Sequence, residues 1–122
     1  MANLLIVEDS QELARFLERA AELGGHRVVL AGNGREALDR FAEGGIDLMV
    51  LDLVMPEMDG LEALDRLRKM NPSCPVLAIS GGGRVGAEDY LRIAAELGAE
   101  RTLAKPFTAQ QFLSEVDALL ES

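Results

Sequence analysis

Short apolar runs alternate along this chain with segments in which apolar residues recur every three or four positions. The runs are only a few residues long, and glycine, proline, asparagine or acidic residues stand close to them. Such runs are typical of strands that are buried on both faces of a parallel sheet. We predict five strands, over Asn3–Glu8, His26–Ala31, Ile46–Leu51, Val76–Ile79 and Arg101–Ala104.

The intervening segments have helical periodicity and recognisable ends. Ser10 is a good N-cap for a first helix that stops at Gly24-Gly25, and Asn33-Gly34 turns the chain into a shorter second helix. Further helices are expected after Gly60, near 88–97 and after Thr108, which caps the last one. The apolar stripe of the first helix consists of Leu13, Phe16, Leu17, Ala20 and Leu23, and that of the third of Leu61, Leu64 and Leu67.

Regular alternation of strands and helices predicts the α/β class: a single doubly wound, five-stranded parallel sheet with helices on both faces. The second strand ends without a side chain of catalytic type, which fits an edge position. We therefore expect the flavodoxin-like order 2-1-3-4-5, with a topological switch point between strands one and three. The ends of these two strands carry Glu8-Asp9 and Asp52.

Composition narrows the possible functions. The 122 residues suggest one domain, and 12 basic against 21 acidic residues give a net charge of −9. This charge argues against nucleic acid and anionic membranes as partners. No basic leader precedes the first strand, and no apolar stretch approaches the ~20 residues needed to span a bilayer. We expect a cytoplasmic protein, without an internal disulfide because Cys74 is the single cysteine.

Polar residues of particular kinds follow four of the predicted strands. They are Glu8 and Asp9, then Asp52, Ser80 and Lys105. Because ligands bind at the carboxyl ends of parallel strands, these groups are expected to converge. Carboxylates are ligands that Mg²⁺ prefers, an aspartate can accept a phosphoryl group covalently, and a lysine can neutralise the charge that develops. The set predicts a site for a divalent metal and a phosphoryl group.

Each of these residues has a simpler interpretation when taken alone. Asp52 could be a turn residue, Glu8-Asp9 could cap the first helix in competition with Ser10, Ser80 could be a loop hydroxyl and Lys105 a surface charge. Four such coincidences at the same end of four strands are much harder to accept together.

The chain resembles the receiver domain of two-component response regulators, the chemotaxis-regulator-like (CheY-like) fold. The matching motifs cover the whole chain: residues 5–10, residues 52–60, Ile79-Ser80-Gly81 and Lys105-Pro106-Phe107. The resemblance implies that Asp52 is the phosphoacceptor, that Ser80 is the switch hydroxyl and that Lys105 contacts the phosphate. It also implies a metal site made of Glu8, Asp9, Asp52 and the Val54 carbonyl, occupied by Mg²⁺ with Mn²⁺ as a substitute, and a Lys105–Pro106 bond that is usually cis.

The same resemblance implies partners. The phosphoryl group would come from a histidine kinase or a histidine phosphotransfer protein that docks near Ser10 to Leu17, and a downstream protein would read the face of the last two helices and last strand. The protein would catalyse only its own phosphorylation and dephosphorylation, and so would not act as an enzyme on other molecules. We expect residues 1–122 to be one receiver domain with no output domain.

Two departures from the family pattern bear on signalling. Thr102 occupies a position that is commonly Tyr or Phe, which weakens the case for switching by an aromatic side chain. We expect the signal to run instead through Ser80 and the loop Gly81-Gly82-Gly83. Val54 and Gly82 occupy positions that tune phosphate lifetime in the family, and neither side chain can orient a water molecule by hydrogen bonding.

Three rival functions remain to be weighed. A magnesium phosphatase of the haloacid-dehalogenase pattern would want a second acid two residues after Asp52, where Val54 stands. A pseudo-receiver that only docks to partners is disfavoured by the intact acids and lysine. Residues 81–86 match the G-x-G-x-x-G pattern of dinucleotide sites, but not in the first βα unit where that pattern belongs.

His26, the only histidine, is expected to face solvent on an edge strand.

Overall fold

The computed structural model describes residues 2–53, 60–80, 92 and 94–121. Its five strands are β1 (Asn3–Val7), β2 (Arg27–Ala31), β3 (Leu48–Asp52), β4 (Val76–Ser80) and β5 (Arg101–Ala104). All neighbouring strands pair in parallel, in the order β2-β1-β3-β4-β5. The predicted fold class and strand order are confirmed.

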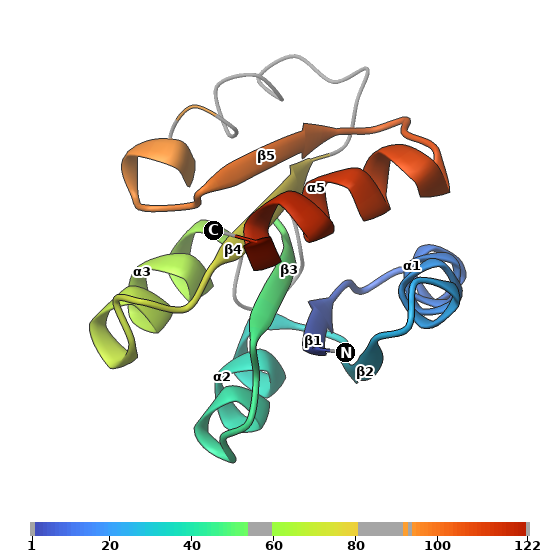
Figure 1. Cartoon of the computed structure of the whole chain (residues 1–122). Coiled ribbons are helices and arrows are strands. Elements are labelled where there is room, and N and C mark those ends of the chain that lie inside the picture. Colours follow the sequence, from blue (N-terminus) through green and yellow to red (C-terminus); the bar gives the residue numbers. More distant parts are fainter. Residues whose placement is uncertain (1, 54–59, 81–91, 93, 122) are drawn as a thin grey trace.

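The labelled helices form one layer on each face of the sheet. They are α1 (Gln11–Leu23), α2 (Gly34–Ala42), α3 (Gly60–Met70) and α5 (Ala109–Glu121). Figure 1 shows α1 and α5 on one side of the sheet and α2 and α3 on the other. The helix expected near 88–97 falls largely outside the described residues.

Two apolar clusters separate the sheet from these helix layers. Alternate residues of each strand point to opposite faces, so that Leu4 and Ile6 pack with α1 and α5 while Leu5 and Val7 pack with α2 and α3. Every residue of β3 and β4 is buried, as expected for central strands of a parallel sheet. The core therefore holds the carboxyl ends of β1, β3 and β4 at fixed spacing.

Side-chain capping sets where three of the helices begin. The Ser10 side chain accepts from the Leu13 N–H, and Asn33 does the same for the Glu36 N–H. At α5, Thr108 and Gln111 exchange hydrogen bonds between side chain and backbone in both directions, which is a capping box. The predicted caps at Ser10 and Thr108 are confirmed.

Three expectations about individual residues were wrong. Phe16 is 40% exposed and Leu23 is 86% exposed, because the buried face of α1 is made by smaller residues and Leu17. His26 does not face solvent: its side chain is only 8% exposed, because it lies between the start of β1 and α5.

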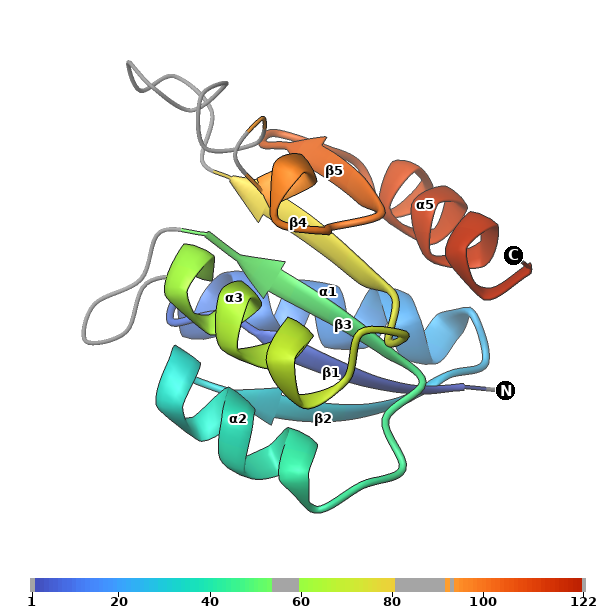
Figure 2. The same cartoon turned by 90° about the vertical axis from the view of Figure 1, so that its left-hand side faces the viewer.

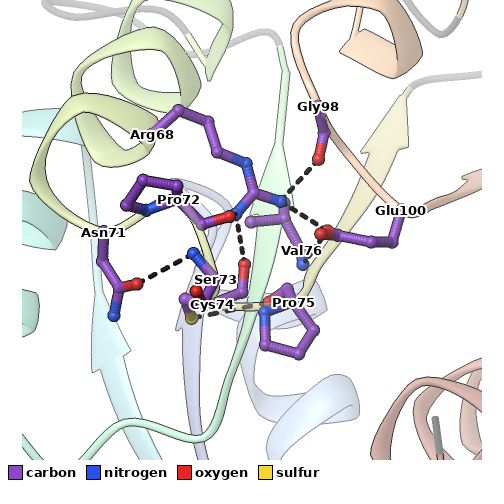
Figure 3. Close-up of polar contacts among 9 residues, drawn as sticks. All are labelled: Arg68, Asn71, Pro72, Ser73, Cys74, Pro75, Val76, Gly98 and Glu100. Atoms are coloured by element: carbon purple, nitrogen blue, oxygen red, sulfur yellow. Dashed lines mark hydrogen bonds and ion pairs between the residues drawn. The ribbon is translucent and has the colours of Figure 1, made fainter.

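Arg68 joins three segments at the end of the sheet where β4 begins. Its guanidinium donates to the carbonyls of Pro72, Cys74 and Gly98 and to the carboxylate of Glu100. Glu100 in turn accepts from the Val76 N–H. Figure 3 shows this arrangement, which we call the Arg68 cluster; it ties α3 to the start of β4 and to the segment before β5.

Candidate functional site

The carboxyl ends of four strands lie at the same end of the sheet, and each supplies a polar side chain. Asp52 and Ser80 are the last residues of β3 and β4, Glu8 follows β1, and Lys105 follows β5. In Figure 2 the strand arrows point to this end of the sheet, and both chain termini lie at the opposite end of the molecule. The parallel topology therefore brings together groups that are almost one hundred residues apart in sequence.

Three carboxylates meet at the switch point between β1 and β3. Glu8, Asp9 and Asp52 each offer one oxygen, and these atoms all lie within 4.8 Å of one another. Glu8 and Asp52 are both 3% exposed, whereas Asp9 is exposed. Glu8 Oε1 is buried and has no hydrogen-bond partner among the described residues, although Lys105 Nζ lies 3.6 Å away, so a coordinating cation would satisfy it. This all-oxygen donor set fits Mg²⁺, which prefers hard ligands and usually keeps several waters.

Lys105 supplies the cation that faces these acids. Its Nζ lies 3.3 Å from Asp52 Oδ2 and 3.6 Å from Glu8 Oε1. The Lys105 backbone N–H donates to the Ser80 carbonyl at 2.9 Å, which fixes the chain where β5 ends. The Lys105–Pro106 peptide bond is cis. One ammonium group thus serves both buried carboxylates.

Glu8 has the most perturbed acidity in the site. The pKa of its carboxyl is raised to about 8, first by burial and then by the neighbouring Asp52 through a hydrogen bond and like charge. The Ser10 N–H and Lys105 act in the opposite direction. Burial and the neighbouring acid therefore favour the protonated form of Glu8 when no metal is bound.

Ser10 resolves the competition between capping and ligand roles. Its side chain caps α1, while its backbone N–H donates to Glu8 Oε2 at 3.1 Å. Because Ser10 supplies the cap, the acids are not needed for it. The interpretation of Glu8-Asp9 as the helix cap was wrong.

Ser80 is 1% exposed, and its hydroxyl is buried without a hydrogen-bond partner among the described residues. The register pairs Asp52 with Ile79, so Ser80 lies one residue beyond the neighbour of Asp52 on the adjacent strand. A buried hydroxyl without a partner needs an additional hydrogen-bonding group, which a bound ligand could supply. Val54 and the Gly81-Gly82-Gly83 loop lie outside the described residues, and Thr102 is half-buried on β5 beside Ala78.

The sequence analysis missed an aromatic row beside the lysine. The Phe107 ring lies 6.4 Å from that of Phe16 on α1 and 6.3 Å from that of Phe112 on α5, measured between centroids. The only sign of this row in the sequence is that Phe107 stands two residues after Lys105, in Lys105-Pro106-Phe107. The row packs the segment after β5 against α1, close to the acids.

The family profile and the similar known sequences all indicate the same family. The profile of the response regulator receiver domain matches residues 4–117. The transcriptional regulatory protein YkoG of Bacillus subtilis, itself uncharacterised, is 37% identical over 97% of this chain. The response regulator MprA of Mycolicibacterium vanbaalenii is 36% identical over the same share. The chain spans about half the length of these curated relatives, 50% in both cases.

Solved structures agree with the sequence relatives. A putative response regulator from Chloroflexus aurantiacus superposes with a TM-score of 0.90 at 30% identity, covering 99% of this chain and 98% of the other. The chemotaxis protein CheY4 of Vibrio cholerae gives 0.88 at 26% identity, covering 98% of this chain and 99% of the other. Both likenesses extend over nearly the whole of each chain.

Proposed function

Because this chain belongs to the response regulator receiver domain family of two-component signalling, we propose that it accepts a phosphoryl group on Asp52. The donor is a phosphohistidine on a histidine kinase or a histidine phosphotransfer protein. The single observation that supports this best is the buried Asp52 carboxylate, held within the acid cluster and 3.3 Å from the Lys105 ammonium.

The chemistry is a phosphoryl transfer between two proteins. An Asp52 carboxylate oxygen forms a bond to phosphorus as the bond from phosphorus to the donor imidazole breaks, and the imidazole leaves with that electron pair. Lys105 offsets the negative charge that accumulates, and the unpartnered Ser80 hydroxyl donates to a phosphoryl oxygen. Glu8 must be ionised to act as a ligand, so its proton leaves when the metal site fills.

We propose that Glu8, Asp9 and Asp52 hold Mg²⁺, with Mn²⁺ as a substitute, and that the Val54 carbonyl is a further ligand. The bound ion would supply positive charge that neutralises both the carboxylates and the phosphoryl oxygens. Glu8 and Asp9 position it, and the buried side of the site limits access of water.

The partners that we propose are proteins. The donor docks on α1 near Ser10 to Leu17, where Phe16 is 40% exposed, and the downstream partner reads the face that includes β5 and α5. The net charge of −9 supports contact with proteins rather than with nucleic acid or membranes. None of the described helices has the length and apolar character needed to cross a membrane. We further propose a cytoplasmic location and no catalysis beyond the protein's own phosphorylation and dephosphorylation.

The proposal is tested by measuring intact mass after incubation with acetyl phosphate and Mg²⁺. We expect one added phosphoryl group, and we expect it to be lost in Asp52→Asn and in the presence of a chelator. Asp39→Asn, which removes an exposed acid on α2, is the matched control and should be labelled like the unaltered protein.

Labelling of Asp52→Asn at the full rate would place the modification elsewhere and reject Asp52 as the acceptor. If the unaltered protein binds Mg²⁺ but is not labelled by acetyl phosphate or by a phosphorylated histidine kinase domain, a docking role without phosphorylation is the better function.

A further inference from the structure

An open surface cavity of about 570 Å³ lies at the end of the molecule opposite the acid cluster. One wall comes from residues before the strands, including His26 and Asp47, and the other from the end of α5, including Asp117, Leu120 and Glu121. Its volume lies within the range of pockets that bind small ligands or anchor side chains. Figure 2 shows the end of α5 and the start of β1 at the same end of the molecule, opposite the carboxyl ends of the strands.

The cavity is strongly acidic. Asp47, Asp117 and Glu121 line it, and none of the described lining residues is a lysine or arginine. The last turn of α5 also lacks a basic residue, so the negative end of its helix dipole is not compensated there. Asp117 has 60% of its side chain exposed, and a ligand can reach it. These charges favour a cation.

His26 adds a buried polar group that lacks a partner. Its Nδ1 accepts from the Ala2 N–H, so the neutral ring carries its proton on Nε2. This Nε2 is buried without a hydrogen-bond partner, and the nearest carboxylate oxygen, Asp117 Oδ1, lies 3.6 Å away. A 3.6 Å separation is too long for a hydrogen bond. The wall of the cavity therefore contains an unused donor next to the acids that would attract a cation.

We propose that this cavity is a docking pocket for an arginine or lysine side chain carried by a segment of a partner protein. The basic group pairs with the carboxylates of Asp117 and Glu121, and the stem of the side chain packs on Leu120. Binding of the basic group to the exposed Asp117 draws its carboxylate toward the buried His26 Nε2, from 3.6 Å into hydrogen-bond distance.

A metal ion fits the cavity less well than a basic side chain. Among the described residues, only Glu8, Asp9 and Asp52 bring three ligand atoms of this kind within 4.8 Å of one another. The acids of the cavity are too dispersed to form one coordination shell, which a basic side chain does not need.

The test is a titration of the full chain, labelled with ¹⁵N, with the peptide acetyl-Leu-Arg-Leu-amide. We expect amide shifts confined to the cavity, at Ala2, His26, Leu119 and Leu120, and a shift of the His26 Nε2 resonance. Replacing arginine by uncharged citrulline in the peptide, or using the Asp117→Asn/Glu121→Gln protein, should weaken binding at least about threefold, the scale of one or two exposed ion pairs. Asp39→Asn should bind like the unaltered protein.

Two results would overturn the proposal. One is equal binding of the citrulline peptide, or equal binding by the double variant, because the carboxylates would then be irrelevant. The other is equally tight binding of free ethylguanidinium, which would make the cavity a site for small cations. Labelling of Asp52 by acetyl phosphate in the double variant should stay unchanged, which confirms that the variant is folded and that the two sites are separate.

Discussion

Glu8 couples the acidity of the site to the stability of the protein. Its pKa is about 8 in the folded chain and 4.5 in an exposed peptide. Its contribution to stability is therefore complete below pH 4.5 and is lost as the pH rises through 8, because the unfolded chain releases the proton first. In a chelator, we expect the free energy of unfolding from this group to fall by on the order of a few kcal/mol between pH 5 and 9.

Thermal unfolding in EDTA at several pH values measures this dependence, and Glu8→Gln provides the contrast. The amide cannot ionise, so the variant should lose less stability on going to pH 9 than the unaltered protein. Mg²⁺ should remove most of the difference in the unaltered protein and little in the variant. An identical slope for both proteins in EDTA would mean that Glu8 is already ionised at neutral pH.

Lys105 is the one described cation that contacts both buried acids. Replacing it in Lys105→Met leaves the charge that develops on the phosphoryl group without its ammonium. We expect labelling by acetyl phosphate to slow by roughly 100-fold or more, the scale of a lost electrostatic contact in a transition state. The rate is followed by intact mass in saturating Mg²⁺.

Lys69→Met is the matched control for the lysine variant. Lys69 lies on α3 with 76% of its side chain exposed, and among the described residues it pairs with Asp65, one turn away on the same helix. Its loss should leave the labelling rate within about twofold, because exposed pairs contribute little. Comparable rates for both variants would exclude Lys105 from the reaction.

At the scale of elements, the Arg68 cluster fixes how α3, β4 and the segment before β5 meet. Arg68 has 14% of its side chain exposed, and Glu100 and three carbonyls depend on it (Figure 3). Arg68→Met leaves these acceptors without their donor, so we expect a loss of about 2–4 kcal/mol in the free energy of unfolding. Urea denaturation monitored by circular dichroism measures it.

Arg66→Met tests whether this loss is specific to the cluster. Arg66 is exposed on the same helix, two residues away, and its replacement should change stability by less than about 0.5 kcal/mol. Gly98→Ala should also destabilise, because its φ is +110° and a Cβ there would lie 3.0 Å from Arg68 Nε. If the Arg68 and Arg66 variants were equally stable, the Arg68 cluster would contribute no more to stability than an exposed side chain does.

The capping box at α5 gives a smaller effect. Thr108→Ala removes the side-chain acceptor for the Gln111 N–H, and we expect the protein to lose about 1 kcal/mol of stability. Thr108→Ser keeps the hydroxyl and should restore most of it. Urea denaturation of the two variants under the same conditions separates the hydrogen bond from the lost methyl group.

The features of the fold that depend on local residue patterns could be predicted from the sequence. The strand ends at Asp52 and Ser80 were predicted to within one residue, because apolar runs and polar stops are local patterns. Ile46 was placed two residues too early in β3, since Asp47 turns outward to accept from the Asn3 N–H. The burial of His26 and the contacts of Arg68 with Gly98 and Glu100 depend on residues that are 24 or more positions away, and no periodicity reports such contacts.

At the scale of the whole molecule, the excess of acidic residues destabilises the folded state. The net charge of −9 is spread over a small domain, so the folded state carries self-repulsion that the expanded chain relieves. In EDTA at pH 7, raising monovalent salt from about 20 to 300 mM should raise the melting temperature by a few degrees.

Choline chloride should reproduce the effect of sodium chloride at equal ionic strength, because screening does not depend on which cation is used. A rise with sodium alone would indicate binding of that ion. No rise with either salt would mean that local ion pairs already compensate the excess charge.

The site draws on strands that are far apart in the sequence, and this has a consequence for protein synthesis. Glu8 is made well before Lys105, and β5 must join the sheet before its lysine reaches Asp52. A nascent chain that has only reached the end of β4 already has the acids Glu8, Asp9 and Asp52 but no ammonium opposite them. The acid cluster therefore stays without its lysine until β5 and the segment after it have been synthesised, and we expect fragments that stop before β5 not to accept a phosphoryl group.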